Sequence, residues 1–136
     1  MVVVDGAGLP LGVHLASASP AEVTLIETTL DNVPPDDDGY DRVERLVYDK
    51  AADSDPLRES LAERGVQLIC PHRDNRVKPP TQDGRPLRRY RRRWIVERSI
   101  AWLGNYRRLL VRHEYYPEIF LTFIHIACAL IALTRL

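Results

Sequence analysis

Hydrophobic positions divide the chain into alternating strand-like and helix-like segments. Apolar, β-branched runs with turn residues between them predict four strands, at residues 1–4, 9–16, 45–48 and 66–70. Helical spacing between capping residues and glycine predicts four helices, at about 20–30, 56–64, 87–114 and 119–133. Alternation of strands with helices is typical of an α/β fold in which helices cover a mixed sheet.

Two polar, proline-bearing stretches, near 31–42 and 71–86, predict long loops. A chain of 136 residues has room for one domain, so we expect a single, partial domain over residues 1–136. The apolar run at 119–133 is shorter than the roughly 20 residues of a spanning helix. We therefore predict a buried core helix and no membrane association. Cys70 and Cys128 lack the spacing of a zinc site or a disulfide scaffold, which favours a reduced, cytoplasmic location.

Charge is distributed unevenly although the formal net charge is +0. Residues 1–70 hold 5 Lys and Arg against 14 Asp and Glu, and residues 71–136 hold 14 against 5. One interpretation is an acidic half that holds cations and a basic half that holds an anionic polymer. The other is that the two halves neutralise each other in the fold, and both can be true.

The basic segment 89–112 contains one acid, Glu97. At 100° per residue, one helix face carries Tyr90, Arg93, Glu97, Gly104 and Arg108. A lone carboxylate on such a face suits a metal ligand that works against a phosphate backbone. It equally suits a surface ion pair with a neighbouring arginine, and periodicity by itself favours that second interpretation.

Tyr90, Arg93 and Glu97 are spaced as Y-x2-R-x3-E, which resembles the signature of bacterial insertion-sequence DDE transposases of the IS4/IS5-like superfamily. Four further blocks resemble that family in its own order, at residues 4–19, 48–73, 92–114 and 123–136. Together they cover most of the chain. The sequence departs from the pattern at Gly104, where the family often has Lys, and at Ala52, where it commonly has Tyr.

The resemblance implies a ribonuclease-H-like mixed sheet flanked by helices, and metal-dependent DNA cleavage and strand transfer during transposition. The family uses two Asp and one Glu to hold Mg²⁺, for which Mn²⁺ substitutes. Asp49 matches the second acid and Glu97 the third, so both are candidate catalytic residues and metal ligands. Asp53 and Asp55 are interpreted as helix-start acids.

The family's first acid is expected on a strand before the first strand of this chain. We therefore expect a C-terminal fragment that lacks the first central strand and the N-terminal DNA-binding region. Asp5 precedes glycine and matches a hairpin of the family, so we interpret it as a turn residue. Such a fragment is expected to be inactive alone and to need an upstream transposase segment or a transposase dimer.

DNA, as element ends and target, is the expected partner, which predicts association with the nucleoid. Arginine suits phosphate because its planar fork donates twice. The candidate contacts are Tyr90, Arg91, Arg92, Arg93, Trp94, Arg98, Arg107, Arg108, Arg73, Arg76 and Lys78. Two alternatives remain open: a non-enzymatic DNA-binding remnant, and a fragment that interferes with full-length transposase.

Overall fold

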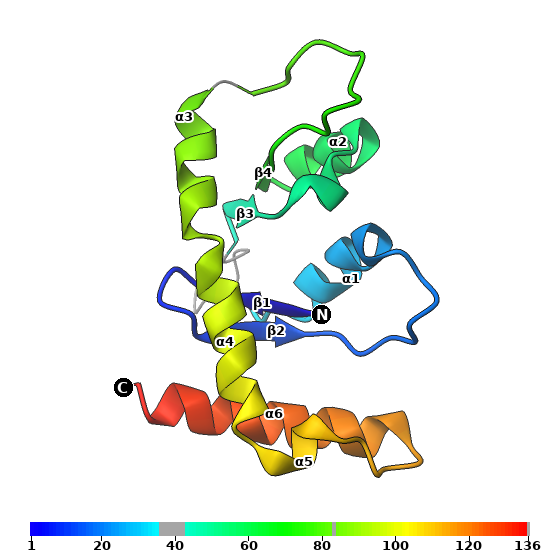
Figure 1. Ribbon diagram of the computed structural model, residues 1–136, viewed down its shortest axis with the longest axis vertical. Helices are drawn as coiled ribbons and strands as arrows, with labels where there is room; N and C mark the ends of the chain where they lie inside the picture. The colour runs from blue at the N-terminus through cyan, green and yellow to red at the C-terminus, as the bar shows by residue number, and fades with distance from the viewer. Residues whose placement is uncertain (36–42, 83, 136) are drawn as a thin grey trace. The chain divides into compact units, whose positions relative to one another are not determined.

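The structure is a computed structural model that describes residues 1–35, 43–82 and 84–135. Contacts divide the chain into two compact units (Figure 1). The first joins residues 1–34 to residues 94–136, and the second spans residues 35–93. Each unit contains one pair of strands with its own helices. The predicted loop at 31–42 falls largely on residues 36–42, which lie outside the described residues.

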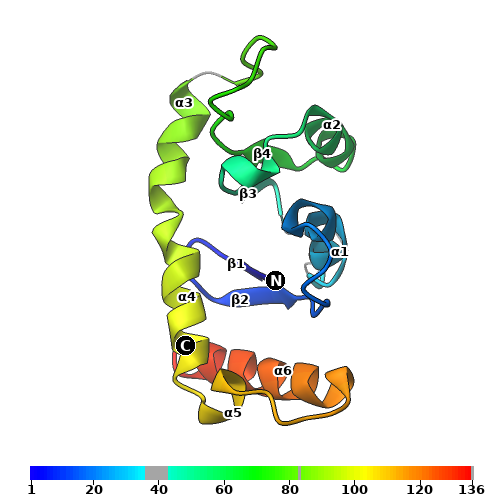
Figure 2. The ribbon, with the colours of Figure 1, turned by 45° about the vertical axis from the view of Figure 1, so that its right-hand side comes forward.

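The first unit is built on an antiparallel hairpin of β1 (Val2–Val4) and β2 (Pro10–Val13), in which Val2 lies opposite Val13. Its helices are η1 (Glu22–Leu25), α1 (Ile26–Asp31), α4 (Trp94–Gly104), α5 (Arg107–Leu110) and α6 (Pro117–Leu133). The hairpin contacts α1, α4 and α6 (Figure 2). Its core contains Val13, Ile26, Leu30, Ile95, Ala127 and Ile131.

The second unit is built on a parallel pair, β3 (Arg45–Val47) and β4 (Gln67–Ile69), in which Leu46 lies opposite Leu68. The connection between them runs through η2 (Lys50–Ala52) and α2 (Asp55–Glu63). Leu57 and Leu61 of α2 are buried, and Gly65 ends the helix with a φ of +77°, which a side chain would disfavour. The unit continues into α3 (Gly84–Leu87) and η3 (Arg88–Arg92).

The predicted α/β class and the predicted order of strands and helices are confirmed. The four strands pair as an antiparallel hairpin and a parallel pair, one in each unit, where we had expected one mixed sheet. The ribonuclease-H-like arrangement and its missing central strand stay predictions.

The predicted single helix over 87–114 is wrong. The chain forms a short α-helix to Leu87, a 3-10 turn over 88–92, α4, and a break before α5. Gly104 and Asn105 are poor helix formers, and they coincide with the end of α4.

The prediction of a buried core helix at 119–133 is correct for only one face of α6. Ala127 and Ile131 are buried against the first unit, whereas Ile119, Ile126 and Leu133 are exposed. In the described part of the chain, none of the helices has the length and apolar character needed to cross a membrane.

Candidate functional site

Asp49 follows β3 and begins the turn η2. Its Oδ1 accepts a hydrogen bond from the Ala51 amide at 2.8 Å, which fixes the side chain against its own turn. Its Oδ2 lies 3.6 Å from Nη2 of Arg93, and both side chains are more than a third exposed. One carboxylate oxygen is thus used by the turn, and the other faces an arginine that the sequence had predicted as a DNA contact.

The turn after Asp49 is tied to the segment that follows β4. The Arg73 guanidinium donates from Nε to the Lys50 carbonyl at 3.2 Å and from Nη2 to the Ala51 carbonyl at 2.8 Å. Lys50 in turn reaches Asp74, with Nζ 2.8 Å and 3.0 Å from the two carboxylate oxygens. These contacts join residues 50–51 to residues 73–74 across more than twenty positions of sequence.

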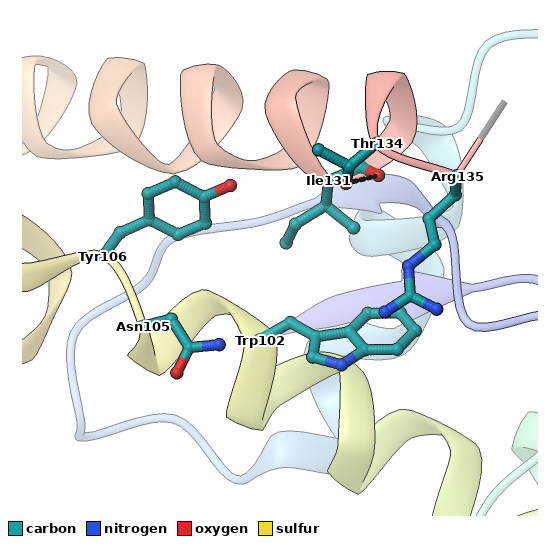
Figure 3. Close-up of a pocket in the computed structure, with 6 residues that line it drawn as sticks. All are labelled: Trp102, Asn105, Tyr106, Ile131, Thr134 and Arg135. Carbon is teal, nitrogen blue, oxygen red and sulfur yellow. Dashed lines mark hydrogen bonds between the residues drawn. The ribbon is translucent and has the colours of Figure 1, made fainter.

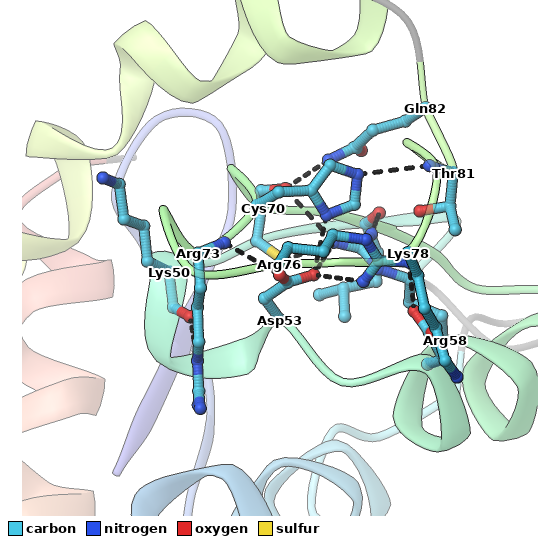
Figure 4. A network of polar contacts seen from close by, with 12 residues as sticks. Lys50, Asp53, Arg58, Cys70, Arg73, Arg76, Lys78, Thr81 and Gln82 are labelled. Carbon is cyan, nitrogen blue, oxygen red and sulfur yellow. Dashed lines mark hydrogen bonds and ion pairs between the residues drawn. The ribbon is translucent and has the colours of Figure 1, made fainter.

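Asp53 is the centre of a buried polar network in the same unit (Figure 4). Its side chain is 2% exposed. Oδ1 lies 2.8 Å from Nδ1 of His72, 3.0 Å from Arg58 and 3.4 Å from Arg76. Oδ2 accepts from the Arg73 amide at 2.8 Å. The prediction of Asp53 as a helix-start acid is wrong: α2 begins at Asp55 with Ser54 as its N-cap, and the Asp53 carboxylate instead binds the loop 72–76.

The charge of Asp53 is stabilised in the folded protein. Burial by itself would raise the pKa of this carboxyl. Hydrogen bonds from the Arg73 amide, His72 and Arg58 outweigh that effect and lower the pKa well below its usual range. Asp53 is consequently a carboxylate at neutral pH, as its cationic neighbours require.

Arg58 and Arg76 are both largely buried around this network, with side chains 12% exposed. Arg58 also donates to the Leu68 carbonyl at 3.2 Å and contacts the Cys70 Sγ at 2.9 Å. Burial raises the pKa of the Cys70 thiol. These contacts tie α2 to the end of β4.

Arg76 extends the network to a second acid. It forms an ion pair with Asp55 at 2.8 Å, and Lys78 lies 3.1 Å from the same carboxylate. The nearby Arg76 and Lys78 lower the pKa of Asp55. Asp55 is the first residue of α2, as predicted, but its partners come from the loop 76–78.

Glu97 lies exposed in the first turn of α4. The two residues after it hold α4 against the hairpin turn of the first unit. Ser99 donates to the Gly8 carbonyl at 2.7 Å, and Arg98 donates to the Ala7 carbonyl at 2.6 Å. Gly8 has a φ of +91°, and an added Cβ would stand 2.9 Å from Ser99 Oγ. The glycine therefore allows the hairpin turn to approach the helix that carries Glu97.

Asp5 serves this same hairpin turn. Its Oδ1 accepts from the amides of Ala7 and Leu9, each at 2.8 Å. The Asp5 carboxylate therefore binds backbone amides of its own turn, which agrees with the predicted turn role.

Tryptophan and arginine side chains alternate along one face of α4. The Arg98 guanidinium lies 4.9 Å from the ring centre of Trp94 and 4.7 Å from that of Trp102, within the range of cation–π attraction. Arg135 stacks on Trp102 at 3.8 Å. Trp102 and Arg135 also line a pocket with Asn105, Tyr106, Ile131 and Thr134 (Figure 3). Trp94 is 53% exposed.

The predicted DNA contacts differ in how accessible they are. Arg91, Arg92 and Arg107 are exposed, whereas Tyr90 and Arg93 are half-buried. Arg108 is exposed too, but it pairs with Glu114 at 3.1 Å. By contrast, Arg73, Arg76 and Arg98 use their guanidinium groups within the protein.

The sequence model of the transposase DDE domain matches residues 1–132. The chain belongs to this family. It is also 34% identical over 134 residues to a protein named as a candidate transposase for insertion sequence element IS402 in Burkholderia cepacia. That similarity covers 96% of this chain and 60% of the relative, so the chain spans about 60% of the relative's length. No solved structure matches.

The transposase DDE family is divalent-metal dependent, and the acids of this chain fit such an ion chemically. Mg²⁺ prefers carboxylate oxygens and needs few of them, because it keeps several waters. The Asp49 side chain is 36% exposed and lies beside Arg93, and Glu97 is exposed on α4. Within residues 1–35, 43–82 and 84–135, no group of three or more His, Cys, Asp or Glu side chains could hold a metal.

Sequence reasoning missed the network around Asp53. Its members are spread over residues 53–76, and none of them has the spacing of a known motif. The one available signal is the block 48–73, which carries the family resemblance and ends at Arg73. That block includes Asp49, its turn, and most of the residues that brace the turn.

Proposed function

We propose that this chain contributes the second and third acids, Asp49 and Glu97, to a DDE transposase that cleaves DNA and joins the cut ends to a target. Membership of the transposase DDE family supports a role in DNA transposition. The observation that carries the assignment of Asp49 is its placement: it follows β3, its Oδ1 is fixed by the turn, and its side chain is 36% exposed. Carboxyl ends of parallel strands are where such sheets place ligand sites.

The chemistry needs a divalent ion, Mg²⁺ or Mn²⁺, which makes a water or hydroxyl nucleophilic and stabilises the leaving oxygen. The part of this chain is to supply carboxylate ligands at fixed positions. The Ala51 amide holds the Asp49 carboxylate through a hydrogen bond. Glu97 lies on α4, which Ser99 joins to the hairpin turn through a hydrogen bond. We propose that Arg93, which lies beside Asp49 Oδ2, would bind a phosphate oxygen of the DNA.

DNA is the proposed substrate, and the exposed arginines are the proposed backbone contacts. Arg91 and Arg92 are exposed on η3, and Arg107 is exposed at the start of α5. Their contacts would position DNA and read little sequence. Binding should weaken steeply with salt, with a log–log slope of about −0.9 for each phosphate neutralised. Arg91→Gln and Arg107→Gln should each reduce that slope by roughly one.

Strand cleavage tests the proposal directly. The chain alone is expected to bind DNA without cutting it, and Mn²⁺-dependent nicking is expected once a segment that carries the family's first acid is supplied. Asp49→Asn and Glu97→Gln should then abolish nicking while DNA binding persists. Glu59→Gln is the matched control, because Glu59 is an exposed acid on α2 of the second unit.

Two outcomes would replace the proposal. Salt-sensitive DNA binding without nicking, even with the first acid supplied, would favour a non-enzymatic DNA-binding protein. The exposed arginines favour that second candidate independently of the acids. If the chain neither binds nor nicks DNA, interaction with another transposase chain is the remaining function. Copurification with an upstream segment would support that function.

A further inference from the structure

The turn that presents Asp49 has an unusual anchor. Its two carbonyls at Lys50 and Ala51 both accept from one side chain, the guanidinium of Arg73. The backbone of the same arginine donates to Asp53 Oδ2 at 2.8 Å, one residue after the turn. Arg73 therefore holds residues 50, 51 and 53 together from outside, through three different N–H groups.

We propose that Arg73 is a positioning residue for Asp49: its guanidinium clamps the η2 turn so that the Asp49 carboxylate is presented in one orientation. This proposal deepens the proposed function and rests on it, because a fixed orientation matters most for a ligand. The chain of contacts is short. Arg73 fixes the Ala51 peptide, and the amide of Ala51 fixes Asp49 Oδ1 at 2.8 Å.

The paired contact with two successive carbonyls requires an arginine at position 73. The donors Nε and Nη2 of one planar group reach two successive carbonyls at 3.2 Å and 2.8 Å. A lysine ammonium is a point charge on a flexible stem and lacks that fixed fork. Lysine at position 73 would keep the charge but could not reproduce the paired contact.

The rest of the network holds the clamp in place. The Asp53 carboxylate, which binds the Arg73 amide, is itself surrounded by His72, Arg58 and Arg76. The position of Arg73 is thus set by a buried network, while its guanidinium extends over the exposed turn. This arrangement gives Arg73 an internal role, and its predicted contact with DNA stays a prediction.

Amide hydrogen exchange, followed residue by residue by NMR on the full chain, tests the clamp. The Ala52 and Asp53 amides donate to the Asp49 and Lys50 carbonyls within the turn, so their protection reports its order. Arg73→Lys and Arg73→Met should speed exchange at these two amides by roughly tenfold, with little change in β3 or α2. Arg45→Lys is the matched control, because Arg45 forms an exposed pair with Glu44 outside the turn.

Three results would overturn the clamp: unchanged exchange in Arg73→Lys, faster exchange throughout the second unit, or an equal effect of Arg45→Lys. A Mn²⁺ titration of the same samples tests whether the clamp positions Asp49 for metal binding. Arg73→Lys should require several-fold more Mn²⁺ than the wild type to broaden the Asp49 and Ala51 amides. If the wild type itself shows no such broadening, the proposed function fails, whereas the exchange data still decide whether Arg73 orders the turn.

Discussion

Replacing Asp53 with Asn should destabilise the protein strongly, although the change only replaces one carboxylate oxygen with an amide NH2 group. The carboxylate is 2% exposed and faces His72, Arg58 and Arg76 within 2.8–3.4 Å. The two arginines, each 12% exposed, would be left without their common counter-charge. Breaking a buried ion pair on one side typically costs about 3–5 kcal/mol.

An asparagine retains one oxygen that can still accept from Arg58 or from the Arg73 amide, so we place Asp53→Asn near the lower end, at about 3 kcal/mol. That is a large part of the roughly 5–15 kcal/mol that stabilises a whole domain. Urea denaturation followed by circular dichroism at neutral pH measures the change in the free energy of unfolding.

The matched control is Asp74→Asn. Asp74 also pairs with a cation, Lys50, at 2.8 Å, but its side chain is 90% exposed. Solvent screens such an exposed pair, so this variant should stay close to the wild type in stability. A loss of stability in Asp53→Asn no larger than that in Asp74→Asn would refute the assignment of Asp53 as the centre of the network.

The difference in unfolding free energy between the wild type and Asp53→Asn should also depend on pH. The pKa of Asp53 is lowered in the folded protein, so its stabilising contribution is complete above the pKa of the unfolded carboxyl, about 3.9. The contribution is lost as the pH falls from there toward the folded pKa. The difference in unfolding free energy between the wild type and Asp53→Asn should therefore narrow below about pH 4. A difference that widens on acidification would contradict the argument.

Three further changes have defined outcomes. Gly8→Ala should lower stability by at least about 1–2 kcal/mol, because its φ is +91° and an added Cβ would meet Ser99 Oγ; Gly84→Ala, with nothing within 4 Å of the added Cβ, should be nearly neutral in the same thermal melts. Leu61→Ala should cost about 2–5 kcal/mol in urea denaturation, since Leu61 is fully buried. The Cys70 thiol, whose pKa burial raises, should react with an aromatic disulfide reagent at pH 8 much more slowly than after unfolding, and equal rates would contradict its burial.

Local signals in the sequence predicted the elements well. Strand-like runs gave β3 and β4 within a residue or two of their observed ends, and Gly65 marked the end of α2. Asp5 was interpreted as a turn residue from its Asp-Gly pair, and its carboxylate does bind two amides of that turn. Such signals succeed because the cause lies within a few residues of the effect.

Predictions that depended on distant partners succeeded less often. The arginine-rich segment has helical spacing, but the chain forms a 3-10 helix over Arg88–Arg92 and breaks again after Gly104. Arg73 and Arg76 were predicted as DNA contacts on charge alone, which stays a prediction, but their contacts within the protein were not foreseen. Their partners, at residues 50–55, lie about twenty positions away along the chain, and no local sequence pattern predicts these contacts. Asp49 and Glu97 were found through the family resemblance, not through spacing.

The most direct test of the central claim is a Mn²⁺ titration of the isotopically labelled chain, followed by paramagnetic broadening of its amide signals. The account predicts early, local broadening around Asp49 and around Glu97, lost at each place in Asp49→Asn or Glu97→Gln and retained in Glu59→Gln. Broadening that instead centres on the exposed acids elsewhere, or that neither substitution changes, would contradict the assignment of these two acids as metal ligands.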